Sequence, residues 1–386
     1  MSEFRTIREL CSVVVDCPHS TPKWTANGKI VIRNNNIKHG RIDFSSPSYT
    51  DDEHFAQRIK RAKPQPGDII ITREAPIGDV GMIPENTECC LGQRMVLLRA
   101  NQSVCDNFYL LYSLQSLYVQ HQISWSEGTG TTVSNLRIPH LEQIQIPYLP
   151  LEQQAKISSV LRALEEKIEN NRRLNDNLLA QAQTLYKQFF PYGVQDDLPD
   201  GWRIGTVGEI IEIHDSKRIP LSGADRSKME KKIYPYYGAA SLMDLVDNYI
   251  FDGKYLLLGE DGTVVDDAGY PILQYVWGQF WVNNHAHILT GRLGYDVESL
   301  YMLFKQTPVK SIVTGAVQPK ISQANLRSVQ VVIPPEHNLR EYNDLVEPLF
   351  SLFRANEEEC KTFTALRDTL LPKLMSGEID VSAVQL

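Results

Sequence analysis

The chain has 386 residues, of which 42% are hydrophobic and 22% are charged, and its formal net charge is −8. This length predicts two or three domains, each able to bury its own core, and the composition is that of an ordinary globular protein. The negative charge argues against a general nucleic-acid binder, which is usually basic, but it leaves room for a local basic surface because steering depends on charge distribution.

No apolar run approaches the ~18 residues of a membrane span, and the charged first twenty residues contain no run typical of a signal peptide. The six cysteines show no CxxC pair and no paired spacing: Cys11, Cys17, Cys89, Cys90, Cys105 and Cys360. This pattern favours reduced thiols in the cytoplasm over a disulfide framework or a zinc site. We therefore expect a cytoplasmic protein without a membrane partner.

The first half of the chain predicts a domain of mixed α and β structure. Residues 4–15 open it, and short strand-like runs follow at 29–33, 69–72, 75–83 and 91–100, several of them preceded by Gly or Pro turns. Residues 106–123 place apolar side chains at helical spacing. The second half restarts at about residue 199, after a linker rich in Pro, Gly and Asp, and repeats this order. In that repeat WVNNHAHIL corresponds to LGQRMVLLR, and ESLYMLFKQ corresponds to FYLLYSLQS.

Residues 151–189 predict a long helix with the narrow apolar seam of a coiled coil, bounded by Pro150 and Pro191. A surface helix with a narrow apolar stripe is the alternative. The seam residues fall at alternating spacings of three and four: Ile157, Leu161, Leu164, Ile168, Asn171, Asn175, Leu178, Ala182, Leu185 and Phe189. Asn in such a seam costs stability but fixes the register.

A second copy of this seam lies at residues 342–374, where Asn356 corresponds to Asn171. Its members are Tyr342, Val346, Leu349, Phe353, Asn356, Cys360, Phe363, Arg367, Leu370 and Leu374. Because the first helix leads out of one domain and the second returns from the other, we expect an antiparallel pair, a pseudo-twofold relation and Asn175 near Asn356. Pro348 predicts either a kink in the second helix or a start just before it.

A helix of about 38 residues spans ~57 Å, and a twofold arrangement of two readers suits two half-sites on DNA. Two basic clusters lie at similar depths in the halves: Arg58, Lys60, Arg61 and Lys63, and then Lys217, Arg218, Lys228, Lys231 and Lys232. Two equivalent loops, 128–132 and 315–320, carry hydroxyl, amide and amino groups suited to DNA contact, notably Thr129, Thr131, Gln318 and Lys320. A solvated surface is the alternative for each cluster and loop.

Catalytic signatures are absent from the sequence. There is no P-loop, no Gly-rich nucleotide loop and no DPPY- or NPPY-type motif, and Ser46-Pro47-Ser48-Tyr49 lacks the second proline. Glu165 and Lys167 superficially resemble a nuclease motif, but they lie in the predicted coiled-coil helix, where a solvated face is the better interpretation. His285 and His287 lie on one face of a predicted strand, and a metal site would need further ligands. We therefore expect no metal.

Several phrases in the chain resemble the specificity subunit of type I restriction-modification enzymes. These phrases are LRDTLLPKLMSGEI (366–379), IPYLPLEQQ (146–154), YYGA (236–239), LLGEDG (257–262) and VNNHAH (282–287). The resemblance covers nearly the whole chain. It implies an α+β fold of two similar target-recognition domains, at residues 1–149 and 191–335, with one conserved spacer helix at 150–190 and a second, together with the C-terminal tail, at 336–386.

The resemblance also implies a subunit without catalytic activity that reads a bipartite double-stranded DNA target. Two modification subunits and, through them, restriction subunits are the expected partners, with S-adenosylmethionine bound by the modification subunits and no cofactor in this chain. Arg94, Tyr237 and His285 join the basic and loop residues above as candidate DNA contacts. A methyltransferase or fused enzyme, and a scaffold that only joins partners, are the two alternatives. An enzyme needs a nucleotide-binding or S-adenosylmethionine-binding motif, and the sequence contains none.

Overall fold

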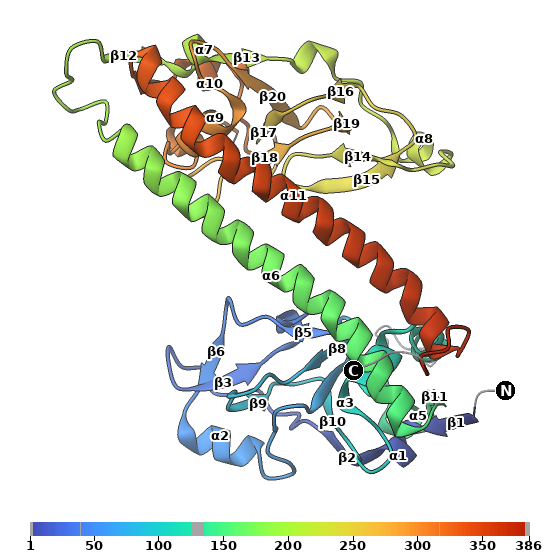
Figure 1. Ribbon diagram of the computed structural model, residues 1–386. Coiled ribbons are helices and arrows are strands. Elements are labelled where there is room, and N and C mark those ends of the chain that lie inside the picture. Colours follow the sequence, from blue (N-terminus) through green and yellow to red (C-terminus); the bar gives the residue numbers. More distant parts are fainter. Residues whose placement is uncertain (1–2, 39, 126–134, 316, 383–386) are drawn as a thin grey trace. The chain divides into compact units, whose positions relative to one another are not determined.

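The computed structural model describes residues 3–38, 40–125, 135–315 and 317–382. These residues form two compact units, one made of residues 1–170 with 359–386 and the other of residues 171–358 (Figure 1). Each unit combines sheets, short helices and a part of each of two long helices. None of the helices in the described ranges is long and apolar enough to cross a membrane.

The first unit is built on a four-stranded antiparallel sheet of order β2-β10-β7-β8 and a three-stranded sheet of order β6-β3-β9. Strand β1 pairs with β11 and β4 with β5. The strands are β1 (Glu3–Thr6), β2 (Cys11–Asp16), β3 (Lys29–Ile32), β4 (Ile37–Lys38), β5 (Arg41–Ile42), β6 (Ser48–Thr50), β7 (Ile69–Arg73), β8 (Ile77–Met82), β9 (Cys89–Leu91), β10 (Met95–Ala100) and β11 (Gln145–Tyr148). The short helices are α1 (Ile7–Leu10), η1 (Asn34–Asn36), α2 (Asp52–Arg58), α3 (Asn107–Gln115), α4 (Leu117–Trp125) and α5 (Ile138–Gln143).

The second unit is built on sheets of order β13-β20-β17-β18 and β15-β14-β19-β16, with β12 paired to β21. Its strands are β12 (Arg203–Thr206), β13 (Ile211–Ile213), β14 (Tyr234–Tyr237), β15 (Leu242–Val246), β16 (Phe251–Asp252), β17 (Tyr255–Gly259), β18 (Leu273–Val276), β19 (Gln279–Val282), β20 (Ala286–Gly291) and β21 (Gln330–Ile333). Its short helices are α7 (Val207–Ile210), η2 (Asp215–Lys217), α8 (Gly223–Ser227), α9 (Val297–Phe304), η3 (Lys310–Ile312) and α10 (Gln323–Ser328).

The two units share the topology of their main sheets, which confirms the predicted internal repeat. The sheets β2-β10-β7-β8 and β13-β20-β17-β18 follow the same order, and β3–β9 and β14–β19 are parallel pairs at equivalent positions. The sheet that contains β14 and β19 has one additional strand, β16. Each unit also contains a strand followed directly by a one-turn helix, β1 and α1 or β12 and α7. A capping box formed by Thr6 and Glu9 or by Thr206 and Glu209 starts that helix, and two of its apolar side chains are buried.

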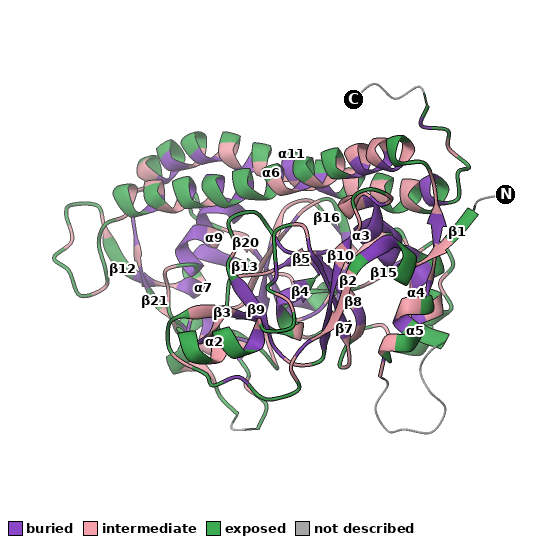
Figure 2. Cartoon of the chain, turned by 90° about the horizontal axis from the view of Figure 1, so that it is seen from below, coloured by how far each residue is buried: buried purple, intermediate pink, exposed green. Residues whose placement is uncertain are grey.

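The main core of each unit lies between the sheet β2-β10-β7-β8 or β13-β20-β17-β18 and the helices that pack on it (Figure 2). Helices α3 and α9, which the repeat pairs, bury most of their apolar side chains in these cores. All six cysteines are buried. Burial raises the pKa of the Cys11 and Cys89 thiols to about 12, so these cysteines act as small apolar core residues.

Two long helices complete the fold: α6 (Leu151–Phe189) and α11 (Glu336–Met375). The bounds of α6 confirm the helix predicted between Pro150 and Pro191. Helix α11 is continuous through Pro348 and begins twelve residues before it, at Glu336. The expectation that the helix starts just before Pro348 is therefore wrong.

Every predicted seam residue of the two helices is buried or half-buried. Buried members are Ile157, Leu161, Ile168, Asn171, Asn175, Leu178, Ala182, Tyr342, Val346, Asn356, Cys360 and Leu374. Half-buried members are Leu164, Leu185, Phe189, Leu349, Phe353, Phe363, Arg367 and Leu370. The alternation of three and four residues thus identified the buried face of both helices.

The two helices pack antiparallel within each unit. In the second unit the Tyr342 hydroxyl donates to the Ala182 carbonyl at 3.3 Å, and Asn356 Nδ2 donates to Asn175 Oδ1 at 2.9 Å. In the first unit Cys360 Sγ lies 3.6 Å from the Ile168 carbonyl oxygen. Residue numbers rise along one helix as they fall along the other, and the predicted meeting of Asn175 with Asn356 is confirmed.

Glu165 differs from the expectation of a solvated face. Its side chain is 14% exposed, and Oε2 accepts a hydrogen bond from the Tyr112 hydroxyl at 3.0 Å. Burial raises the pKa of this carboxyl, against the opposing effects of the Tyr112 hydrogen bond and of Arg41 and Arg367. Glu165 is thus a structural contact between α6 and α3.

Replacing Asn356 with Leu leaves the buried Asn175 oxygen without a donor, so N356L should lower the free energy of unfolding of the second unit by about 1–3 kcal/mol. The double variant N175L/N356L removes both amides and should recover most of this loss. Urea unfolding monitored by circular dichroism measures both. The control N177L, on the exposed side of α6, should change stability by under ~0.5 kcal/mol. Equal stability of N356L and the wild type would contradict the role given to this pair.

Candidate nucleic-acid interface

Backbone hydrogen bonds join three segments of the second unit at one edge of its main sheet. The Glu260 N–H, just after β17, donates to the His285 carbonyl at 2.8 Å, in the connection between β19 and β20. The Ile321 N–H, just before α10, donates to the Glu260 carbonyl at 2.9 Å. Glu260 therefore links the other two segments through both of its backbone groups.

The first unit contains the same backbone arrangement, which we call the clasp in both units. The Arg73 N–H donates to the Arg94 carbonyl at 2.8 Å, and the Leu136 N–H donates to the Arg73 carbonyl at 3.0 Å. Leu136 and Ile321 are both fully buried beneath it. The clasp makes Arg73 equivalent to Glu260, Arg94 to His285 and Leu136 to Ile321.

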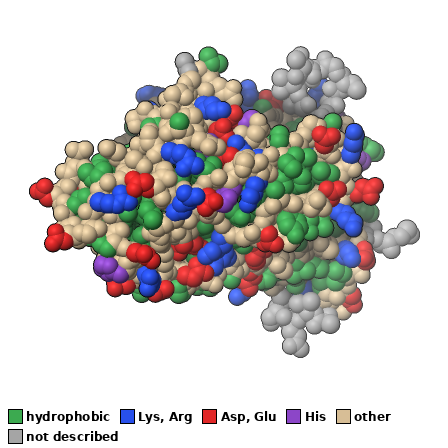
Figure 3. All heavy atoms as spheres, turned by 90° about the horizontal axis from the view of Figure 1, so that it is seen from above, with side chains coloured by type: hydrophobic (Ala, Val, Ile, Leu, Met, Phe, Trp, Pro, Cys, Tyr) green, Lys and Arg blue, Asp and Glu red, His purple; other side chains and the backbone are tan. Residues whose placement is uncertain are grey.

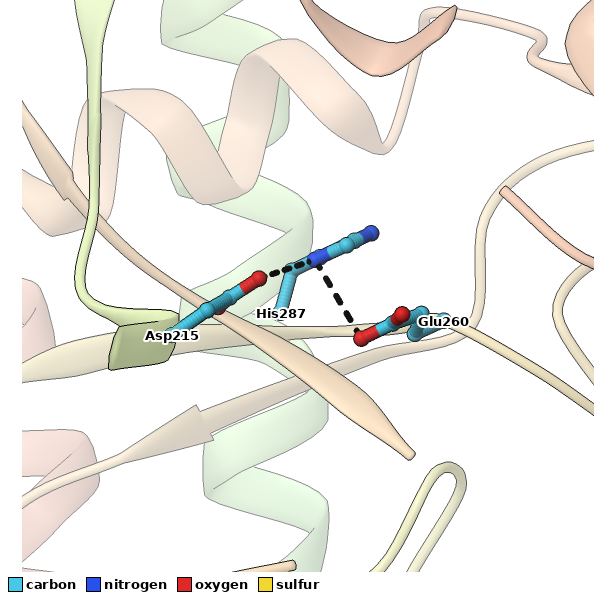
Figure 4. A group of neighbouring side chains, drawn as sticks. All are labelled: Asp215, Glu260 and His287. Atoms are coloured by element: carbon cyan, nitrogen blue, oxygen red, sulfur yellow. Dashed lines mark hydrogen bonds and ion pairs between the residues drawn. The ribbon is translucent and has the colours of Figure 1, made fainter. Parts of the chain in front are cut away.

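Side chains reinforce the clasp of the second unit through a network of opposite charges, of which Figure 4 shows Asp215, Glu260 and His287. Glu260 accepts from Arg218 Nη1 at 2.6 Å and lies 3.2 Å from Lys320 Nζ. His287, which is fully buried on β20, contacts Asp215 Oδ2 through Nδ1 at 2.6 Å, and its Nδ1 lies 3.7 Å from Glu260 Oε2. The network ties Lys320, one of the predicted DNA contacts, to the sheet.

Asp215, Glu260 and His287 bring ligand-type atoms within 4.8 Å of one another, but their bonding does not suit a metal ion. His287 Nε2 lies 2.8 Å from the Ile321 carbonyl, which can only accept, so this nitrogen carries a proton. Its Nδ1 faces a carboxylate, and Arg218 and Lys320 already balance the acidic charge. We therefore read the cluster as a charge-balanced structural network.

The pKa values of the two carboxyl groups agree with this interpretation. Burial raises the pKa of Asp215, but the hydrogen bond from His287 and its charge outweigh burial, and the pKa lies below its ordinary value. Burial likewise raises the pKa of Glu260, and the hydrogen bond from Arg218 with the charge of His287 outweighs it. Both carboxylates are thus held in the charged form.

In the first unit the residue at the centre of the clasp carries a positive charge, whereas Glu260 in the second unit carries a negative one. Arg73 takes the place of Glu260, and its Nη1 donates to both Asp16 oxygens at 2.9 Å. Its Nε donates to the Leu136 carbonyl at 2.8 Å and its Nη2 to Asn135 Oδ1 at 3.1 Å. One backbone frame thus carries different side chains in the two units, and the surface chemistry differs while the frame is kept.

Comparison with known proteins follows the same division into two halves. The family model described as "Type I restriction modification DNA specificity domain" matches residues 3–180 and again 199–359. The chain belongs to this family. Each match covers one copy of the internal repeat, and together they span most of the chain. Membership identifies the chain as a DNA specificity subunit, which is a non-catalytic class of protein.

Two relatives from Methanocaldococcus jannaschii extend over most of this specificity chain. The type I restriction enzyme MjaIX specificity subunit is 23% identical over 347 residues, which is 82% of this chain and 78% of the relative. The putative MjaX specificity subunit is 20% identical over 402 residues, which is 98% of this chain and 94% of the relative. In fold, the chain is similar to the crystal structure of a type I system S subunit from M. genitalium, with a TM-score of 0.57, 19% identity and coverage of 96% and 95%.

Arg58 does not lie on the surface of this family member. Its residue exposure is 6%, and its guanidinium donates to four backbone carbonyls, those of Pro18, Ser20, Leu91 and Gly92. The group joins the segment after β2 to the end of β9. Arg58 is therefore corrected from a DNA contact to a structural residue, because a basic run does not reveal which of its members faces inward.

The other predicted contacts differ in exposure and in the partners of their side chains. Lys60, Arg61, Lys217, Lys228 and Gln318 are exposed. Lys63 pairs with Glu88, Arg218 is half-buried against Asp215 and Glu260, and Tyr237 is half-buried against Phe280. Thr129 and Thr131 lie outside the described residues. On the face shown in Figure 3, Lys and Arg side chains lie among Asp and Glu side chains and form no continuous basic field.

The clasp brings together Lys320, His285 and Arg218 in the second unit, and it places Arg94 at the equivalent position of the first. Sequence reasoning missed their acidic partners Glu74, Asp261 and Glu260, and it also missed Trp24 and Arg33. The internal repeat could have indicated two of these acidic partners. Once Arg94 is aligned with His285, Glu74 after β7 aligns with Asp261 after β17, and both carry a carboxylate.

Substituting Met for Arg58 leaves four carbonyls without their donor, so R58M should lower the free energy of unfolding by at least about 3 kcal/mol, at about 1–3 kcal/mol for each buried group left unsatisfied. The matched variant R61M, on the exposed side of the same cluster, should stay within ~0.5 kcal/mol of the wild type. Thermal and urea unfolding measure both. A stable R58M protein with reduced DNA affinity would instead make Arg58 a DNA contact.

Proposed function

We propose that each unit reads one half of a bipartite double-stranded DNA target, and that together the units direct a type I restriction-modification complex to that sequence. The observation that supports this most strongly is the repeated clasp. Two units with the same backbone frame present different side chains at equivalent positions, Arg94 and Arg73 in one and His285 and Glu260 in the other. A common frame with different surface groups suits two half-sites of different sequence.

The long helices suit a role in fixing the gap between the half-sites. Each helix contributes to both units, and the buried Asn175–Asn356 pair fixes the register in which the helices pack. A continuous helix cannot change length without breaking backbone hydrogen bonds. The number of unread base pairs in the target would then be set by the length of α6 and α11.

The proposed partners are two modification subunits and, through them, restriction subunits. S-adenosylmethionine is expected to bind the modification subunits, where adenine would be methylated. Both helices keep large apolar side chains in solvent, with Leu174 of α6 and Leu345, Leu352 and Leu366 of α11 between 43% and 51% exposed. Because Leu345 and Leu352 are one heptad apart on the same face, they suit an apolar partner helix. We place the complex in the cytoplasm, with its DNA substrate.

Mapping adenine methylation across the genome, with and without this gene, tests the proposal. Deletion should remove one bipartite motif with a fixed gap, and the gene supplied in trans should restore it. The modification subunit must be expressed at equal level in both strains, as immunoblotting can check. An unchanged methylation pattern, with that subunit present and active, would contradict the proposed function.

Removal of the exposed leucines should separate assembly from folding. We expect L345D/L352D to reduce co-purification with the modification subunit at least tenfold while the unfolding temperature stays within a few degrees, because both side chains are half-exposed. Leu178→Asp places a charge in the buried seam, so it should lower both assembly and stability. The control Asn177→Asp, on the adjacent exposed position of α6, should change neither. Full recovery of the complex with L345D/L352D would exclude this surface as the partner site.

A further inference from the structure

The closest contact of Glu74 with the Arg94 guanidinium is at Nε, not at the two terminal nitrogens. Arg94 Nε lies 3.2 Å from Glu74 Oε2, and the Arg94 side chain is 57% exposed. Among the described residues, no hydrogen bond or ion pair occupies the two terminal nitrogens of Arg94, which form a planar fork of donors. The ion pair therefore directs the fork without occupying it.

Glu74 is itself held from two directions. Its Oε1 accepts from Asn135 Nδ2 at 2.5 Å, and its backbone carbonyl accepts from Asn34 Nδ2 at 2.6 Å. Asn135 belongs to the segment that the clasp joins to Arg73. The orientation of Arg94 thus depends on three segments of the first unit, which is more support than an isolated surface side chain has.

Arg94 also lines a hollow of about 410 Å³ on the first unit, together with Trp24, Arg33, Asn35 and Gln93. The Arg33 guanidinium lies over the Trp24 ring at 5.2 Å, and Trp24 is 46% exposed. Beside this hollow, the buried Asn34 Oδ1 has no hydrogen-bond partner within the described ranges. Guanidinium, amide and aromatic groups that converge on one concave surface are the groups proteins use to bind DNA base edges.

The backbone at this hollow adopts conformations that are uncommon for residues with a Cβ. Arg94 has φ +65° and Ala75 has φ +45°, both in the left-handed region. Such conformations carry a conformational cost and concentrate at functional sites. An exposed ion pair such as Glu74–Arg94 contributes little to stability, so stability alone does not account for this placement.

We propose that Arg94 reads a guanine in the half-site of the first unit, with Glu74 as the positioning residue that directs its fork. This inference rests on the proposed function and names the base class that the unit recognises. The free fork matches the O6 and N7 acceptors that guanine presents in the major groove. Trp24 and Arg33 form the adjoining wall of the hollow.

The second unit offers an internal comparison at the equivalent position. His285 Nδ1 contacts Asp261 Oδ1, and Asp261 aligns with Glu74 because it follows Glu260 as Glu74 follows Arg73. The imidazole is 43% exposed, and the carboxylate fixes it through Nδ1. Nε2 is therefore directed away from its acidic partner. In the same frame, His285 is the base reader of the second half-site.

Methylation mapping with the complete complex distinguishes the two readers. R94A should relax a guanine position in one half of the bipartite motif and leave the other half unchanged, whereas H285A should alter only that other half. R8A, which removes an exposed Arg of the same unit, should leave both halves unchanged. R94K keeps the charge but loses the fork, so it should lose the same guanine preference as R94A.

A binding cycle with 7-deazaguanine tests the contact itself. 7-Deazaguanine lacks N7 but keeps O6, so at the relaxed position it should remove one hydrogen bond of the bidentate contact and weaken wild-type binding about 2- to 12-fold. The same replacement should have no further effect on R94A, and E74A should reduce the wild-type effect partially. E74A and R94A should be non-additive, because both act through one guanidinium.

Two different failures are distinguishable. If the wild-type complex methylates no bipartite motif, the proposed function fails and this inference fails with it. If the motif is present but R94A leaves both halves unchanged, or if 7-deazaguanine affects wild type and R94A equally, the bipartite reading stands and the assignment of Arg94 is wrong.

Discussion

Both units depend on the antiparallel packing of α6 against α11, because each core is closed by residues far apart in the chain. Leu374 and Met375 of α11 are buried in the first unit beside Ile157 and Leu161. Tyr342 is buried in the second unit beside Ala182 and Tyr186 of α6. The first unit therefore needs both ends of the chain. Shifting the register of the helices would displace apolar groups from both cores, and the buried Asn pair opposes such a shift.

In the clasp, backbone hydrogen bonds keep the frame constant between the two units, while the side chains on its surface differ. Backbone groups hold its three segments together, so side chains at its surface are not needed to maintain the frame. This freedom allows an arginine at position 73 and a glutamate at position 260 within the same geometry. Two domains of one topology can in this way read different sequences, and the overall negative charge is compatible with local cationic groups such as Arg94 and Arg33.

The limits of the sequence appear most clearly at single residues. Residue-for-residue matching of WVNNHAHIL with LGQRMVLLR pairs Asn284 with Arg94, but the backbone hydrogen bonds pair His285 with Arg94. A shift of one residue reverses which face of a strand each side chain occupies, and letter matching cannot detect it. The sequence also failed to show that Arg58 and Glu165 are withdrawn from solvent. A charged residue within a charged run has the same sequence context whether it is solvated or bonded to buried groups.

The sequence by itself determined the repeat, the two long helices and their seam residues. These features rest on periodicity and on internal repetition, which local spacing records directly. The family was indicated separately, by the resemblance of several phrases to specificity subunits. Tertiary structure alone decided which charged side chains face outward, that Asp261 and Glu74 hold His285 and Arg94, and that Trp24 and Arg33 share a hollow with Arg94. Those relations join residues from separate strands and loops. Their distances follow from strand pairing and burial, which no single stretch of sequence contains.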